Sequence, residues 1–135
     1  MALMTWSNEY AVGVKALDCQ HTGLFKILND LHDAMMAGHG QQVTGDLLRK
    51  LVSYTKEHFA AEERLMEASH YPALAKHCEH HRALTQQVGD FMALLEKGEG
   101  VVSADLLSFL RDWLKNHIQR EDKEYGPWLN QHGIK

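Results

Sequence analysis

The sequence predicts an all-α protein, an antiparallel up-down-up-down four-helix bundle with an irregular N-terminal arm. Apolar residues recur at alternating steps of three and four along four long segments, which is the spacing of one face of an amphipathic helix. The links between these segments are short, and short links favour antiparallel neighbours. No run of alternating β-branched residues competes with this interpretation.

Length, charge and hydropathy narrow the class of protein. The 135 residues suit one hydrophobic core, so we expect 1–135 to form a single domain. A net charge of -4 argues against a binder of nucleic acid or anionic membranes. No segment approaches the roughly 18 apolar residues that cross a membrane, and the start lacks the basic leader and apolar core of a signal peptide. We therefore expect a cytoplasmic protein with Cys19 and Cys78 reduced, and a monomer because the core uses the apolar stripes.

The first half of the bundle follows an arm at residues 1–17. The first helix is expected over 18–37, and Gly38 and Gly40 end it because glycine readily adopts the left-handed turn at a helix C-terminus. The second helix is expected over 42–66. The core stripe of the first helix consists of Leu17, His21, Leu24, Leu28, Leu31 and Met35.

The second half of the bundle has equally clear boundary signals. The third helix is expected over 71–97, with Pro72 in its first turn, where the missing N–H costs no hydrogen bond. The fourth helix is expected over 103–122 or slightly beyond. The remaining boundary residues are Gly98 and Gly100, which would end the third helix, and Ser103, a good N-cap for the fourth.

Histidines and acids interrupt the apolar stripes at core-facing positions. Burying an imidazole or a carboxylate without a partner costs about 1–3 kcal/mol, so six such residues on four helices are not independent accidents. In an up-down-up-down bundle they all fall within roughly two turns of one level, at about 1.5 Å per residue. We therefore expect one polar cluster at one end of the bundle. Its members are His21 on the first helix, His58 and Glu62 on the second, His77 and His81 on the third, and His117 on the fourth.

The spacing of these residues suits metal ligands. His58 and Glu62, like His77 and His81, are four residues apart and therefore lie on one helix face. Five histidines with two acids exceed the roughly four ligands of a tetrahedral zinc. They suit two six-coordinate metals that share carboxylate bridges, and iron or manganese fits this count. The excess of histidine favours iron.

Spacing alone leaves the second acid open. Glu121 lies four residues after His117 and fits an ideal helix, whereas Asp122 would require a single π turn, a feature frequent at functional sites. The cysteines lie beside ligands in sequence but about 100° away on the helix, so neither is expected to bind metal. The other five histidines fall off the stripes or in links and are expected to be exposed: His32, His39, His70, His80 and His132.

These motifs resemble the hemerythrin family, in its short bacterial single-domain form, over essentially the whole chain. The leading arm carries Trp6-x-x-x-Tyr10-x-x-Gly13, followed by Asp18-x-Gln20-His21. Each fragment is weak alone, but seven ligand positions in this order are highly specific. The later fragments are His58-x-x-x-Glu62, His77-x-x-x-His81 and Trp113-Leu114-x-x-His117-Ile118-x-x-x-Asp122.

The resemblance implies a non-haem di-iron site with a bridging oxo or hydroxo group. By this resemblance His21 and His58 would bind one iron. Glu62 and Asp122 would bridge the two irons, so the resemblance selects Asp122 where periodicity favoured Glu121. The second iron would be bound by His77, His81 and His117.

The function implied by the resemblance is reversible binding of molecular oxygen, as a carrier, a store or a supplier of an oxygen-consuming enzyme, and not as an enzyme itself. Sensing of oxygen, nitric oxide or redox state at the same site is the alternative, followed by a di-iron peroxidase or oxidase and, more distantly, a zinc hydrolase. An enzyme is disfavoured because no tyrosine or general acid is clearly placed in the cluster, although Glu121 is unassigned. Apolar residues beside the ligands would form a wall that excludes water: Leu24, Phe59, Trp113, Leu114 and Ile118.

Overall fold

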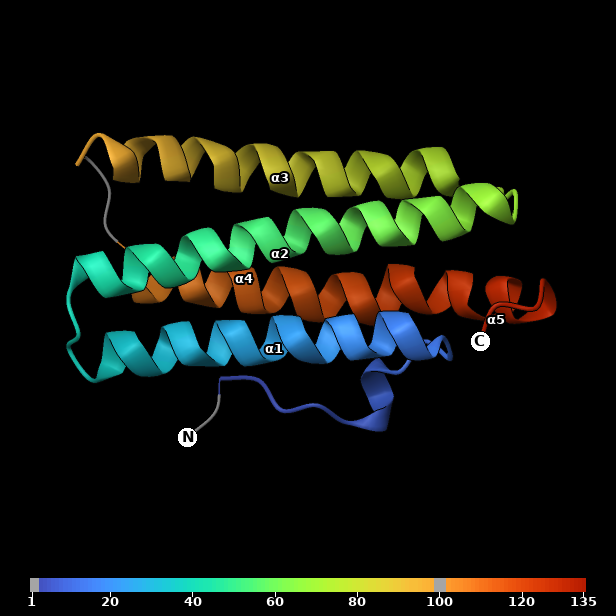
Figure 1. The fold of residues 1–135 in the computed structure, drawn as a ribbon, viewed down its shortest axis with the longest axis horizontal. Helices are drawn as coiled ribbons and strands as arrows, with labels where there is room; N and C mark the ends of the chain where they lie inside the picture. The colour runs from blue at the N-terminus through green and yellow to red at the C-terminus, as the bar shows by residue number, and fades with distance from the viewer. Residues whose placement is uncertain (1–2, 99–101) are drawn as a thin grey trace.

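The computed structural model describes residues 3–98 and 102–135 and has no strand among them. Long antiparallel helices lie side by side as predicted, and the irregular arm runs along the outside of the bundle (Figure 1). The all-α bundle is therefore confirmed. Its first four helices are α1 (Lys15–Met36), α2 (Gln41–Ala68), α3 (Leu74–Glu96) and α4 (Ala104–Asn116).

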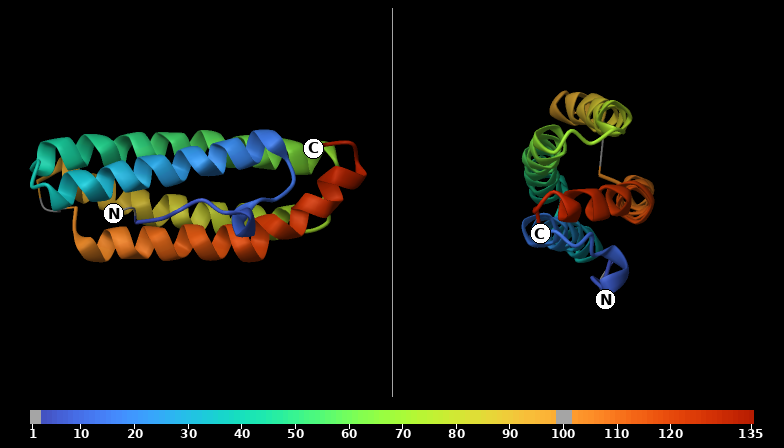
Figure 2. Two further views of the ribbon diagram at one scale, coloured as in Figure 1. Left: turned by 90° about the horizontal axis from the view of Figure 1, so that it is seen from below. Right: turned by 90° about the vertical axis from the view of Figure 1, so that its right-hand side faces the viewer.

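The fourth helical segment continues well beyond its predicted end near residue 122. A π-helical turn, η2 (His117–Asp122), follows α4 without a break and leads directly into α5 (Lys123–Gln131). Figure 2 shows α5 turning across the end of the bundle towards α1. Gly126 and Pro127 lie within α5, although such residues usually mark a helix end.

The link between α2 and α3 also differs from the prediction. The third helix begins at Leu74 rather than 71, and Pro72 lies in the turn before it. Tyr71 precedes a proline and is therefore kept out of helical geometry, while His70 adopts a left-handed φ of 58°.

Gly38 and Gly98 have φ of 72° and 76°, as expected of C-terminal turns. Gly100 lies outside the described residues.

The N-terminal arm is attached to α1 by aromatic packing and hydrogen bonds. It contains one short turn of 3-10 helix, η1 (Asn8–Tyr10). The rings of Trp6 and Tyr10 both pack edge-on against Phe25, at 5.4 and 4.9 Å between centroids. Asp18 accepts hydrogen bonds from the backbone N–H groups of Val12 and Gly13, at 2.7 and 3.3 Å. Trp6 and Tyr10 therefore anchor the arm, and Asp18 joins the first turn of α1 to backbone N–H groups of the arm rather than capping the helix.

The apolar stripes face one another and form the core, and the polar residues that interrupt them are buried with it. Leu17, Leu24 and Leu28 of α1 are each 1% exposed. In the described parts of the chain, no helix is both long enough and apolar enough to cross a membrane.

Candidate metal centre

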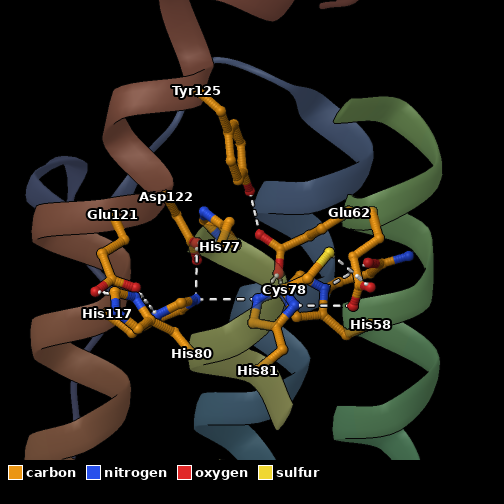
Figure 3. Close-up of polar contacts among 12 residues, drawn as sticks. His58, Glu62, His77, Cys78, His80, His81, His117, Glu121, Asp122 and Tyr125 are labelled. Atoms are coloured by element: carbon orange, nitrogen blue, oxygen red, sulfur yellow. Dashed lines mark hydrogen bonds and ion pairs between the residues drawn. The ribbon is translucent and has the colours of Figure 1, made fainter. Parts of the chain in front are cut away.

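The bundle brings all seven predicted ligands together, and Figure 3 labels all of them except His21. None of them is more than 5% exposed. They come from four separate segments, because each stripe directs its polar residues inward at this level. The seven are His21 on α1, His58 and Glu62 on α2, His77 and His81 on α3, and His117 and Asp122 on η2.

Asp122 lies at the centre of the cluster. Its Oδ1 is 2.9 Å from Nε2 of His77 and 3.0 Å from Nε2 of His117. Its Oδ2 is 3.1 Å from Nε2 of His21, on the opposite side. One carboxylate therefore reaches histidines of three segments, as a group that bridges two metal ions would.

Glu62 has a similar central position. Its Oε1 is 3.1 Å from Nε2 of His58 and 3.4 Å from Nε2 of His81. Its Oε2 is 3.7 Å from Nε2 of His21. All the histidines thus direct Nε2 towards the two carboxylates.

The seven predicted ligands divide into two groups that share both acids. In each group the atoms lie within 4.8 Å of one another, as around a single ion. One group combines Glu62 and Asp122 with three histidines, and the other combines the same acids with two. The first contains His77, His81 and His117, and the second contains His21 and His58.

The chemistry of these donors fits metal ions. Nε2 of His21 and of His77, Oε1 of Glu62 and both Oδ atoms of Asp122 are buried without a hydrogen-bond partner in the described chain. Each such atom costs about 1–3 kcal/mol when left unpaired. Imidazole nitrogens and carboxylate oxygens that converge in this way are ligands for divalent and trivalent transition metals. Metal binding would therefore offset the cost of burying them.

The π turn explains why two adjacent acids take different positions. The wide turn over His117–Asp122 brings Asp122 round to the inside of the cluster. Glu121 remains four residues from His117 and contacts the outer nitrogen, with Oε2 2.6 Å from Nδ1 of His117. Periodicity correctly predicted that Glu121 lies beside His117, but it contacts the outer side of the ring.

The charges within the cluster strongly shift the pKa values of its residues. Burial alone would lower the pKa of His21, but the carboxylates of Asp122 and Glu62, close to its Nε2, raise it to about 9. Burial likewise opposes protonation of His117, yet Asp122 and Glu121 raise its pKa to about 10. Although burial favours neutral acids, the neighbouring histidines hold the pKa values of Glu62 and Asp122 well below their usual range. The acids therefore stay ionised and available as ligands.

Several histidine rings are also held at their outer nitrogen, Nδ1. His58 donates to Oε1 of Gln20 at 2.6 Å. His81 donates to Oε2 of Glu63 at 3.0 Å. Such partners fix the orientation of a ligating ring.

His80 was expected to be exposed, and it is partly exposed, but it also contacts Glu121 beside the cluster. It is 38% exposed, and its Nδ1 lies 2.5 Å from Oε1 of Glu121 (Figure 3). Its place just before His81 brings it to the side of the cluster where η2 passes. The contact depends on the π turn, which sequence spacing alone does not establish.

Tyr125 corrects the expectation that no tyrosine is placed in the cluster. It is fully buried, and its hydroxyl donates a hydrogen bond to Oε2 of Glu62 (Figure 3). Burial, and then the charge of Glu62, raises its pKa well above the usual value, so the phenol stays protonated. Its spacing of three residues from Asp122 was the available signal, but it lies beyond the predicted end of the fourth helix.

Two of the five residues expected to form an apolar wall stack on histidines of the cluster. The ring of Phe59 stacks on His81 at 3.7 Å between centroids, and the ring of Trp113 stacks on His117 at 4.4 Å. An apolar cavity in the bundle lies next to these rings and is lined by four of the five predicted wall residues: Leu24, Phe59, Trp113 and Leu114. Ile118, the fifth, is buried at 0% exposure but lies outside that lining.

The fold and the cluster define a helical-bundle protein that can hold cations between its helices, and comparison with known proteins agrees. The hemerythrin HHE cation binding domain matches residues 12–129. A bacteriohemerythrin of Methylococcus capsulatus is 38% identical over 96% of this chain and 99% of that protein. A bacteriohemerythrin of Stenotrophomonas maltophilia is 34% identical over 98% of this chain and 85% of that protein.

Solved structures agree with the sequence comparison. A crystal structure of wild-type hemerythrin superposes with a TM-score of 0.91 at 38% identity, covering 95% of this chain and 98% of that one. The chain therefore belongs to the hemerythrin family.

Proposed function

We propose that the chain binds molecular oxygen reversibly at two iron ions held by this cluster. The observation that carries the proposal is the pair of donor groups sharing Glu62 and Asp122. One group has five protein donors and the other has four, so the two-histidine position has more room for an external ligand. That position is held by His21 and His58. Oxygen would bind there.

The chain's own residues would hold the ions and keep water away. Iron, when bound, supplies the electrons that oxygen takes up and returns. Glu62 and Asp122 would join the two ions, with an oxo or hydroxo bridge between them. Phe59, Leu114 and the neighbouring apolar side chains limit access of water and protons to the cluster. Their role is to slow irreversible oxidation.

We infer a carrier, a store or a supplier of an oxygen-consuming enzyme rather than an enzyme. The relatives named bacteriohemerythrin and myohemerythrin support this choice. Tyr125 favours a second candidate, a di-iron peroxidase or oxidase, because a buried phenol in contact with Glu62 could donate hydrogen atoms or electrons. Reversibility distinguishes the two functions.

The test is one cycle of oxygen exposure with iron analysis. Protein loaded with ferrous iron should contain two irons per chain and develop a visible absorption band in air that disappears again under argon. A band that decays once and does not return would favour the enzyme. Protein that takes up fewer than two irons would contradict the di-iron site.

Matched histidine variants connect the spectrum with the cluster. His77→Ala should lower both iron content and thermal stability, because metal binding is coupled to folding. His39→Ala removes an exposed histidine outside the cluster and should retain both irons and the band. Equal iron content in the two variants would remove His77 from the ligands.

A further inference from the structure

The outer nitrogens of the histidine rings have partners of different charge. Nδ1 of His81 faces the carboxylate of Glu63, and Nδ1 of His117 faces the carboxylate of Glu121. Both rings belong to the three-histidine group. Two carboxylates therefore contact the outer nitrogens of that group.

The two-histidine group has no such charge behind it. Nδ1 of His58 donates to the neutral amide of Gln20. Nδ1 of His21 is buried without a hydrogen-bond partner in the part of the chain that the structure describes. The two groups thus share Glu62 and Asp122 but differ by two negative charges on their outer side.

Side chains of α3 contact the carboxylates of both Glu63 and Glu121. The thiol of Cys78 donates to Oε1 of Glu63 at 3.0 Å. Nδ1 of His80 lies 2.5 Å from Oε1 of Glu121. Each carboxylate therefore has one oxygen on a ligand ring and the other on Cys78 or His80, which restricts its movement. Figure 3 labels Glu121 between His80 and His117. Cys78 and His80 thereby have a structural use outside the two groups that share Glu62 and Asp122.

We propose that Glu63 and Glu121 are positioning residues that make the three-histidine site the preferred holder of the more highly charged iron. An imidazole that donates its Nδ1–H to a carboxylate is a stronger electron donor at Nε2 than one that donates to an amide or to nothing. The inference rests on the proposed di-iron function. It follows that the two-histidine iron, where oxygen would bind, is the last to lose its electron.

Glutamine variants separate charge from geometry. Glu63→Gln and Glu121→Gln keep the length and an acceptor oxygen but remove the charge. In protein loaded with two irons, each should raise the midpoint reduction potential, and the double variant should raise it further. Loss of outer partners commonly changes metal affinity about 10–100-fold. A tenfold loss of preference for ferric over ferrous iron corresponds to about 59 mV for one electron. Gln20→Glu should narrow the difference between the two irons in Mössbauer spectra.

Glu79→Gln is the matched control. Glu79 is exposed on α3, two residues from both His77 and His81, and takes part in none of the polar contacts found among the described residues. It undergoes the same charge change and should leave the potential near that of the wild type. An equal shift in this control would overturn the proposal, because net charge alone would then explain the effect.

Further outcomes decide between a charge role and a merely structural one. If the glutamine variants keep two irons and the wild-type potential, while Glu63→Ala and Glu121→Ala shift it, the carboxylates only position the rings and the charge proposal is wrong. If the double variant loses iron, the single variants and Gln20→Glu still decide the matter. Wild-type protein that does not bind two irons contradicts the proposed function itself, a result distinguishable by iron analysis before any potential is measured.

Discussion

Glu121 and Asp122 are neighbours in the sequence, yet they contact opposite nitrogens of the same ring. Asp122 lies 3.0 Å from Nε2 of His117, and Glu121 lies 2.6 Å from Nδ1. One residue is thereby a candidate ligand and the other its outer support. Both residues carry the same functional group, and the π turn of the backbone directs the two carboxylates to opposite sides of the ring.

Tyr125 gives a prediction at the same scale. Tyr125→Phe removes the hydroxyl that donates to Glu62 and leaves a buried carboxylate with one donor fewer. Hydrogen bonds to charged groups contribute about 1.5–3 kcal/mol. Metal-free Tyr125→Phe protein should lose free energy of unfolding in that range, measured by urea denaturation.

The control for this variant is another tyrosine beside α5. Tyr71 is half-buried, packs against Trp128, and has no hydroxyl hydrogen bond among the described residues. Tyr71→Phe should therefore change the free energy of unfolding by less than about 0.5 kcal/mol. Equal losses in the two variants would show that the bond between Tyr125 and Glu62 contributes little.

Among the elements, α5 fastens the N-terminal arm to the end of the bundle. A Cβ added at Gly126 would lie only 2.1 Å from the carbonyl oxygen of Val12, so the two backbones are in direct contact there. Asn130 donates to the carbonyl oxygen of Gly13 at 2.9 Å. The arm and α5 therefore support each other beside the cluster.

Substituting the glycine of this contact tests the attachment. Gly126→Ala must push α5 away from the arm, because backbone cannot move aside as a flexible side chain can. Overpacking of this kind costs about 1–3 kcal/mol, so we expect a lower melting temperature.

Gly89→Ala is the matched substitution on α3. A Cβ there would meet nothing within 4 Å, and alanine is about 0.5–1 kcal/mol better than glycine inside a helix. Gly89→Ala should leave the melting temperature unchanged or raise it. If Gly126→Ala behaves in the same way, the arm and α5 are not held together by this contact.

At the scale of the whole molecule, the titration of the cluster predicts opposite effects of pH on metal-free and loaded protein. The pKa values of His21 and His117 are raised from 6.5 to about 9 and about 10. The stability they contribute to metal-free protein is therefore complete below about pH 6.5 and is lost as pH rises through 9 and 10. Iron requires neutral imidazoles, so binding strengthens over the same interval.

At acid pH, the contribution of Glu121 to the stability of metal-free protein changes with pH in the opposite direction. Burial raises the pKa of Glu121, but His117 and then His80 lower it from 4.5 to about 2. Its contribution is present above about pH 4.5 and is lost as pH falls towards 2. Metal-free protein should thus be most stable between about pH 4.5 and 6.5, and the gain in melting temperature on iron loading should increase from pH 6 to pH 9. A gain that does not depend on pH would contradict this account.

The sequence predicts most of the bundle and six residues of the cluster, because helical periodicity places them on inward faces at one level. The seventh, Asp122, was selected only by the resemblance to the hemerythrin family, since periodicity favoured Glu121. The π turn and α5 were not predictable by periodicity, since one extra residue in a turn leaves no mark on the apolar stripe. The pairs Glu63–His81 and Glu121–His80 join different segments. Their formation depends on the rotation of each helix about its axis, which the spacing along one segment does not determine.

The π turn also sets the direction in which the side chains after it point around the helix axis. Removing one residue from His117–Asp122 would turn Asp122, Tyr125 and all of α5 by about 100° relative to α4. Removing one residue between Asp122 and Tyr125 would leave the acid in place and displace only the phenol and the contact with the arm. The π turn thus fixes the rotational position of every later residue about the helix axis. A deletion within it displaces both Asp122 and Tyr125, whereas a deletion after Asp122 displaces only Tyr125.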